Sequence, residues 1–540
     1  MRASNAEQAD LNACDVVVVG AGLAGLYQVH RLQQAGFRVR AFDKGADVGG
    51  TWYWNRYPGA RCDIESIVYS YSFDADLQRE WQWPQRYAEQ PDLLRYLQHV
   101  AERFDLRRHY TFNTAVECAI YDESAQRWRV RTASGEEISA QFLVMATGCL
   151  SIPLEPSFKG LERFRGARYQ TGRWPHAGVD FSGQRVGIIG TGSSSIQATP
   201  LIAKQAEHLF VFQRTPQFAI PAWNRAISAD EMRQVHDSYE DIRRLVRQSE
   251  IGIAYQSPDH GAKQASAEAL QQQLDFAWAR GGYLMLAAYP DLVTDLESNK
   301  LVSDWVKDKI RARIKDPELA DKLMPHYPLG AKRLCVDTDY FETFNRDNVS
   351  LVDLREAAID GFTEQGLRLA DGTHYALDAV VFATGFDAMT GALLAVDIRG
   401  RAGLSLREKW HHGAKNYLGV SVAGFPNLFM ITGPGSPSVL YNMVASIEQN
   451  VDFVSDTIEH LRQHQYTSIE ANAREERAWT KYVDWVSKQT IYTQVKSWYN
   501  GENVDGKPAG FMPYAGGGLT YFEFVRQAVD DGYRGFTLGS

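Results

Sequence analysis

The hydrophobic pattern near the start of the chain predicts a strand, a glycine-rich turn and a helix. Residues 15–19 form a β-branched run, and apolar residues then recur at Leu26, Val29 and Leu32. A short β-branched run is typical of a buried strand, and this later spacing is typical of an amphipathic helix. Gly36 is expected to end the helix, and residues 37–42 are expected to form the next strand.

The turn between the first strand and the helix reads Gly-Ala-Gly-Leu-Ala-Gly from residue 20 to residue 25. Gly20 permits a tight turn, Gly22 lets backbone approach a pyrophosphate, and Gly25 lets the helix pack closely on the strand. Asp43 follows the second strand, where a carboxylate can accept hydrogen bonds from a ribose hydroxyl. The unit therefore predicts a dinucleotide site.

A second unit of the same kind follows, with strands expected at residues 185–189 and 209–213 and a helix at 196–204. Its second strand ends at Arg214 and Thr215 rather than at an acid, and a guanidinium there favours NADP over NAD because it can pair with a 2′-phosphate. Ser195 replaces the third glycine, so we expect slightly altered cofactor geometry or affinity. The turn comprises Gly190, Thr191, Gly192, Ser193, Ser194 and Ser195.

Two more apolar runs, at residues 142–145 and 379–382, each lead into an Ala-Thr-Gly sequence, at residues 146–148 and 383–385. We interpret both as crossovers between domains. The fold class expected is α/β, with two Rossmann-like dinucleotide-binding domains and an inserted helical domain. The first nucleotide domain would comprise residues 1–150 and 386–540, the second 151–222 and 331–385, and the helical insertion 223–330.

Helical patterns within that insertion are clearest at residues 265–278 and 320–324. Its aromatic residues Trp278, Tyr283 and Tyr289 are assigned mostly to packing. A chain of 540 residues agrees with two to four domains.

Composition and charge narrow the class of partner. The chain is 44% hydrophobic with a formal charge of −9, and it has no lysine-rich or arginine-rich block. A nucleic-acid partner is therefore not expected. Residues 1–15 lack the basic and apolar regions of a leader, so we expect a cytoplasmic protein that does not span a membrane.

The five cysteines are scattered, with no CxxC pair and no metal-ligand spacing. We expect reduced, structural thiols and no metal. This argues against a disulfide-reductase flavoenzyme, whose redox cysteines must lie close together.

Five segments carry a family resemblance: residues 49–63, 331–333, 383–387, 433–438 and 164–175. With these motifs the chain resembles type I Baeyer–Villiger monooxygenases along nearly its whole length, most closely the phenylacetone and steroid monooxygenase branch. The resemblance implies FAD at the first site and NADPH at the second. It also implies conversion of ketones to esters or lactones with O2 through a C4a-peroxyflavin, and possible oxidation of sulfides.

The same resemblance implies roles for individual residues. Arg333 would be the fixed cation beside the flavin, because a guanidinium stays charged at every working pH, and Asp63 would orient it. Lys332 would join Arg214 and Thr215 at the 2′-phosphate. The flavin would be lined by Gly50, Thr51, Trp52, Trp54 and Tyr57, NADP would contact Ala383, Thr384, Gly385 and, on a mobile loop, Trp498, and the substrate would meet Val439, Leu440, Tyr441 and Met443.

The family fingerprint, FxGxxxHxxxW followed by Pro or Asp, departs here at one position. Gln170 stands where the family has histidine, while Phe164, Gly166, Trp174 and Pro175 match. Glutamine cannot change its protonation state near neutral pH. Because the family histidine lies in a linker that coordinates domain movement, we expect impaired coupling rather than lost activity.

Two alternatives stay open. A flavin-containing or N-hydroxylating monooxygenase would share both nucleotide units and act on heteroatoms, although Trp174-Pro175 and Arg333 favour the Baeyer–Villiger assignment. The second alternative is a flavoprotein that binds FAD and NADP as a redox sensor and does not catalyse a reaction. For assembly we expect a monomer or a weak homodimer.

Overall fold

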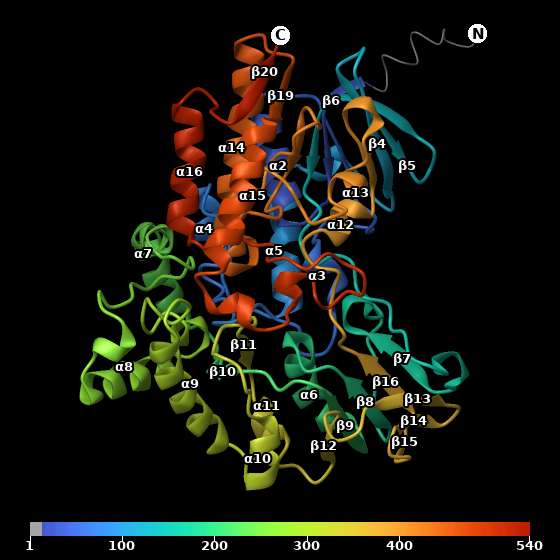
Figure 1. Ribbon diagram of the computed structural model, residues 1–540, viewed down its shortest axis with the longest axis vertical. Coiled ribbons are helices and arrows are strands. Elements are labelled where there is room, and N and C mark those ends of the chain that lie inside the picture. Colours follow the sequence, from blue (N-terminus) through green and yellow to red (C-terminus); the bar gives the residue numbers. More distant parts are fainter. Residues whose placement is uncertain (1–12) are drawn as a thin grey trace.

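The computed structural model describes residues 13–540 (Figure 1). Residues 1–12, which hold most of the stretch used to argue against a leader, lie outside the described residues. Among the helices of residues 13–540, none has both the length and the apolar character needed to cross a membrane. The molecule is built on two sheets and a group of helices.

The first sheet has eight strands, and its centre is the parallel set β6, β1 and β2. Val16 to Val19 of β1 are almost completely buried because both faces of the strand are covered. Val16 and Val18 lie in the core that contains residues of the adjacent helices, and Val17 and Val19 lie in a second core on the other face. Its strands run in the order β17 (Asp397–Arg399), β4 (Val116–Asp122), β5 (Arg127–Thr132), β6 (Glu137–Met145), β1 (Ala13–Val19), β2 (Val39–Phe42) and β3 (Tyr110–Thr111), with β18 (Leu428–Met430) paired to β6.

The second sheet has five strands, all parallel. Its central strand β8 lies between β9 and β16. Strand β16 joins the sheet only after the chain has passed through the group of helices that follows β9. Parallel strands need long crossover connections, which are usually helical. The chain therefore leaves this sheet after β9 and returns to it at β12 and β16. The order is β12 (Val349–Asp353), β9 (His208–Gln213), β8 (Arg185–Ile189), β16 (Ala379–Phe382) and β7 (Ala167–Gln170).

Long helices from the end of the chain pack beside the first sheet (Figure 1). Helix α2 (Leu23–Gln34) lies against α14 (Met443–Gln463), where Gln28 Nε2 donates to Ser455 Oγ at 2.8 Å and Tyr27 donates to Asp452. The other helices of this part are α3 (Thr51–Trp54), α4 (Ala75–Glu80), α5 (Gln90–Arg103), α12 (Gly391–Leu394), α13 (Leu406–Lys409), α15 (Ala473–Ser487) and α16 (Gly518–Asp530).

The second sheet carries α6 (Ser193–Gln205) and α11 (Tyr340–Thr343), and a separate group of helices lies beside it (Figure 1). This group consists of α7 (Ala229–Arg247), α8 (Ala267–Arg280), α9 (Leu296–Arg311) and α10 (Pro317–Leu323). Three small sheets complete the fold: β10 (Ala219–Pro221) with β11 (Cys335–Asp337), β13 (Ile359–Thr363) with β14 (Gly366–Leu369) and β15 (His374–Ala376), and β19 (Ser468–Ala471) with β20 (Phe536–Gly539).

The expected α/β class is confirmed, with strands at both nucleotide units and helices in the insertion. Residues after 386 supply β17 and β18 to the first sheet, while the domain boundaries themselves stay a prediction. The strand expected from residue 37 begins only at Val39, because Phe37 N–H still donates to Leu32 O and closes the preceding helix. The strand expected from residue 142 begins at Glu137, where it pairs with β5.

Both glycine turns press against an Ala-Thr-Gly crossover. Gly20 has φ of 116°, and a Cβ there would lie 2.3 Å from Ala146 O. Gly190 has φ of 108°, and a Cβ there would lie 2.4 Å from Ala383 O. Only glycine fits these positions, so each turn lies directly beside the crossover that leads to the other sheet.

Gly25 and Gly192 offer a test of the packing of these turns. A Cβ on Gly25 would lie 1.8 Å from Gly20 O, whereas a Cβ on Gly192 would meet nothing within 4 Å. We expect Gly25→Ala to lower the thermal unfolding midpoint by several degrees through overpacking, at a cost of about 1–3 kcal/mol. Gly192→Ala should leave the midpoint of the ligand-free protein within about one degree. Equal midpoints for both variants, measured by calorimetry, would contradict this account.

Candidate functional site

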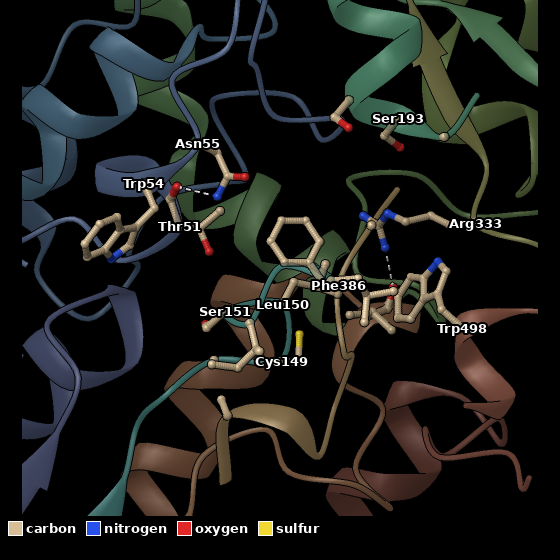
Figure 2. Close-up of a pocket in the computed structure, with 18 of the residues that line it drawn as sticks. Thr51, Trp54, Asn55, Cys149, Leu150, Ser151, Ser193, Arg333, Phe386 and Trp498 are labelled. Carbon is tan, nitrogen blue, oxygen red and sulfur yellow. Dashed lines mark hydrogen bonds between the residues drawn. The ribbon is translucent and has the colours of Figure 1, made fainter. Parts of the chain in front are cut away.

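One cavity of about 1370 Å³ joins both nucleotide turns. Its wall includes Gly20 and Gly22 from the first turn, and Gly190 and Gly192 from the second. Figure 2 shows Thr51, Trp54 and Asn55 on one side of this cavity, and Arg333 and Trp498 on the other. Every site residue predicted from the sequence lines it except Gly25, which packs against Gly20 O beneath the first turn, and Ser195, which is completely buried.

The first turn has a carboxylate at its edge. Asp43 Oδ2 accepts from Ala21 N at 2.7 Å, and Asp43 Oδ1 accepts from Gly45 N at 2.6 Å. Burial raises the pKa of Asp43, and these two N–H groups only partly offset that effect. The carboxylate is therefore held in a fixed position at the end of β2, where a ribose hydroxyl could still use its remaining lone pairs.

The tryptophan-rich segment lies directly on this turn. Gly50 has φ of 52°, and a Cβ there would lie 2.7 Å from Gly22 Cα. Lys44 Nζ lies over the Trp54 ring, 5.3 Å from the ring centroid. Tyr57 donates from its hydroxyl to Gln197 Oε1 at 2.8 Å, so the segment is tied to helix α6 of the second sheet.

Two cations lie beside the second turn. Arg214 is exposed at the end of β9, and Thr215 O accepts from Thr191 Oγ1 at 2.6 Å. Lys332 Nζ lies over the Tyr327 ring, 5.3 Å from the ring centroid. Burial and the positive charge of Arg214 both lower the pKa of Lys332. A phosphate dianion between them would relieve that repulsion, which agrees with a 2′-phosphate site.

Arg333 and Asp63 form a bidentate ion pair inside the cavity. Arg333 Nε donates to Asp63 Oδ2 and Nη2 donates to Asp63 Oδ1, both at 3.0 Å, and Nη1 donates to Val439 O at 2.8 Å. The guanidinium has five N–H groups, and these contacts take three of them. Donors therefore remain for a ligand.

The surroundings of Arg333 keep it charged. Burial acts to lower the Arg333 pKa, but the negative charge of Asp63 outweighs it and holds that pKa well above its usual range. The Tyr283 ring lies under the guanidinium, with its centroid 5.6 Å from Arg333 Cζ. The Tyr283 hydroxyl donates to Leu334 O at 3.1 Å. The cation is thus permanent and fixed in place.

The predicted substrate residues divide into two groups. Val439, Leu440 and Met443 line the cavity near Arg333, whose Nη1 binds Val439 O. Tyr441 also contributes to the wall, but its hydroxyl donates to Val246 O at 2.9 Å and its ring packs edge-on against Phe522. This tyrosine therefore connects the wall to helices α7 and α16.

Gln170 lies at the end of β7, and its amide Nε2 donates to Leu154 O at 2.6 Å. Leu154 belongs to the crossover between the sheets, where its own N–H donates to Gly385 O at 3.0 Å. The residue that replaces the fingerprint histidine is therefore bonded to the crossover. Trp174 of the same fingerprint is buried and packs against Tyr169.

The cavity fits two dinucleotides. Gly192 and Gly385 line the cavity, and a Cβ on either would meet nothing within 4 Å, so both leave open space beside the backbone. Thr384 Oγ1 is buried in the cavity wall and has no hydrogen-bond partner among residues 13–540, which leaves a polar group for a ligand. All five cysteines are free and buried, as expected.

Three residues of the site were missed from the sequence. Tyr283 was assigned to packing but supports Arg333, and Gln197 joins Tyr57 to the second sheet. Asn503 lines the cavity close to the second crossover. No local pattern marks any of them, because their partners are distant in sequence. Trp278 and Tyr289 do pack, against Trp305 and His260 respectively.

Comparison with known proteins agrees with this geometry. Residues 13–228 match the family described as flavin-binding monooxygenase-like. A Baeyer–Villiger monooxygenase of Pseudooceanicola batsensis is 41% identical, covering 96% of this chain and 95% of its own. A phenazine N-monooxygenase of Lysobacter antibioticus is 40% identical, covering 97% of each chain. A solved structure of oxidized steroid monooxygenase bound to NADP is 47% identical, with a TM-score of 0.94, covering 98% of this chain and 99% of that one.

These relatives share both the fold and the full length of the chain, so the resemblance is not confined to one nucleotide unit. The chain is a flavin-dependent monooxygenase, and it belongs to the flavin-binding monooxygenase-like family as one of its Baeyer–Villiger monooxygenases.

Proposed function

We propose that the protein converts a ketone, O2, NADPH and a proton into an ester or lactone, NADP+ and water. The observation that carries this proposal is the Arg333–Asp63 ion pair in a cavity shared by two nucleotide turns. The relatives named as Baeyer–Villiger and steroid monooxygenases support the reaction class. The particular ketone is set by the wall around Val439, Leu440 and Met443.

Two cofactors supply the redox chemistry: NADPH provides two electrons, and bound FAD activates oxygen. FAD would be held by Gly20, Gly22, Asp43 and the segment from Gly50 to Tyr57. NADPH would be held by the second turn, by Arg214, Thr215 and Lys332, and by the crossover from Ala383 to Gly385 together with Trp498.

Arg333 acts as the fixed cation in this proposal. Negative charge develops on oxygen during insertion into a ketone, and a permanent, fixed guanidinium stabilises it without reorganisation. Asp63 positions Arg333, because a bidentate carboxylate sets both the plane and the direction of the guanidinium. Lysine would keep the charge but lose this geometry.

A second candidate function is oxidation of a ring nitrogen. One relative of similar identity is named as a phenazine N-monooxygenase, so identity alone does not separate the two reactions. Both need the same nucleotide sites, and they differ in the atom that receives oxygen.

A panel of ketones, sulfides and aromatic nitrogen heterocycles, incubated with FAD-loaded enzyme and NADPH, tests the proposal. Products heavier by one oxygen atom are identified by mass and separated into esters and N- or S-oxides. Esters or lactones from ketones are expected. N-oxides alone would replace the first function with the second, and NADPH consumption without any product would support the redox sensor.

Arg333→Ala is expected to lower ester formation by at least about 10²-fold, because removing one group that stabilises developing negative charge typically costs this much. Reduction of the bound flavin by NADPH, followed by its absorbance, should persist. Arg86→Ala is a matched control, since Arg86 forms a 2.6 Å ion pair with Glu65 and its side chain is only 10% exposed, but it does not line the cavity. Equal losses in both variants would remove Arg333 from the chemistry.

Arg214→Ala is expected to raise the Kd for NADP+ by roughly 10-fold or more, because a charge-assisted contact contributes about 1.5–3 kcal/mol. The Kd for NAD+, which lacks the 2′-phosphate, should change by less than about 2-fold. Both constants are measured by calorimetric titration of the FAD-loaded protein. A parallel weakening of NAD+ would show that Arg214 does not recognise the phosphate.

Gln170→His tests the fingerprint position. An imidazole restores a group that can titrate, whereas the glutamine amide holds Leu154 O at every pH. We expect the substitution to raise the ratio of ester formed to NADPH consumed. That ratio is measured from product and absorbance at several pH values, and an unchanged ratio throughout would show that position 170 does not affect coupling.

A further inference from the structure

The helical insertion reaches the cavity at the end of α7. Val246 O, in the last turn of this helix, accepts from the Tyr441 hydroxyl at 2.9 Å. Ile251, which follows the helix and lines the cavity, accepts at its O from Asn442 N at 3.1 Å. Tyr441 and Met443 line the same cavity, so the insertion supports the wall that we assign to the ketone.

The contact between α7 and this wall is close. Gly252 has φ of 72°, and a Cβ there would lie 2.7 Å from Asn442 Cβ and 2.9 Å from Tyr441 Cε1. Asn442 Nδ2 donates to Gly252 O at 3.2 Å, and Asn442 Oδ1 accepts from Val444 N and caps α14. Glu250 O accepts from Gly518 N at 3.1 Å, so the end of α7 meets the start of α14 and of α16 (Figure 1).

A buried arginine holds α7 in this place. Arg243 is only 6% exposed, and its guanidinium donates to four oxygen atoms of the segment from residue 68 to residue 78, outside the insertion. These acceptors are Ser70 Oγ at 2.8 Å, Gln78 Oε1 at 2.9 Å, Tyr71 O at 3.2 Å and Val68 O at 3.4 Å. Burial of a guanidinium is costly unless its N–H groups are bound, so displacement of α7 from this segment is disfavoured.

Val68 O joins Arg243 to the cavity wall. It accepts from Arg243 Nη1 at 3.4 Å and from Asn442 Nδ2 at 2.8 Å, so one carbonyl binds both α7 and the residue between Tyr441 and Met443. Glu448 of α14 binds the same segment, because its carboxylate accepts from Ser72 N at 2.5 Å and from Ser72 Oγ at 2.6 Å. The segment is therefore held by the insertion and by α14 together.

We propose that Arg243 is a positioning residue for ketone selection. By holding the end of α7 on residues 68–78, it fixes Tyr441 and Met443 and thereby limits the size of the ketone that fits beside Arg333. Arg243 does not line the cavity, so it acts through Asn442 and Tyr441. This inference rests on the proposed function, since it takes the wall around Met443 as the ketone site.

The first test compares two ketones in FAD-loaded enzyme with NADPH. Arg243→Met removes the donors but keeps a long apolar side chain, and kcat and KM are measured for cyclohexanone and for the larger ring of cyclododecanone. We expect the ratio of kcat/KM for the larger ketone to that for the smaller one to rise by about 3- to 10-fold, mainly through KM. Arg243→Lys, which keeps the charge and some donors, should change this ratio less. Reduction of the flavin by NADPH should stay within about 2-fold of wild type.

The second test follows the wall without turnover. Hydrogen exchange of residues 438–447 in FAD-loaded protein without ketone should be faster in Arg243→Met than in wild type. Arg127→Met is the matched control, because Arg127 also binds neutral oxygen atoms, Cys14 O at 2.7 Å and Ser139 Oγ at 2.8 Å, but lies outside the cavity wall. Exchange in residues 438–447 and the ketone ratio should both be unchanged in this control.

An unchanged ketone ratio in Arg243→Met, or an equal change in Arg127→Met, would overturn the positioning role. Flavin absorbance and thermal midpoints verify folding. If Arg243→Met does not fold, Tyr441→Phe replaces it, because that variant loses only the bond to Val246 O and should shift the ratio in the same direction. If wild-type enzyme forms no ester from any ketone, the proposed function fails; hydrogen exchange then tests Arg243 alone, and unchanged exchange in residues 438–447 would overturn its positioning role.

Discussion

The Arg333–Asp63 ion pair is the contact on which the site depends. Its two residues are 270 positions apart, so it forms only when the segment after the helical insertion returns to the tryptophan-rich segment of the first sheet. Removing two charges from water costs several kcal/mol per ion, and a bidentate geometry with a further carbonyl acceptor is what offsets that cost. The same arrangement that stabilises the pair uses three of the five guanidinium N–H groups and keeps the cation at the cavity wall.

The two nucleotide units are coupled by close backbone contact. Gly20 presses on Ala146, Gly190 presses on Ala383, and the two crossovers that follow are hydrogen-bonded to each other through Leu154 and Gly385. Each turn thus packs on the crossover of its own sheet, and the hydrogen bond between the crossovers joins the two sheets. Both turns therefore contribute to the wall of one cavity.

Departures from the family pattern have local structural explanations. Gln170 retains a hydrogen bond to the crossover where the family has histidine. Tyr441 turns its hydroxyl toward α7, so it connects the cavity wall to the surrounding helices. Ser195 is completely buried, and helix α6 still begins at Ser193. Each change is therefore accommodated without loss of the surrounding elements.

The sequence by itself determined both strand–turn–helix units, the two crossovers and the helical insertion, because periodicity and glycine spacing are local properties of the chain. It also identified Arg333 and Asp63 through motifs. Tertiary structure alone decided that these two meet, that Tyr283 supports the guanidinium, that Gln197 ties Tyr57 to the second sheet and that Asn503 faces the cavity. Such contacts join residues from distant parts of the sequence, and no local pattern of hydrophobic and polar residues encodes which distant partner a buried polar group will find.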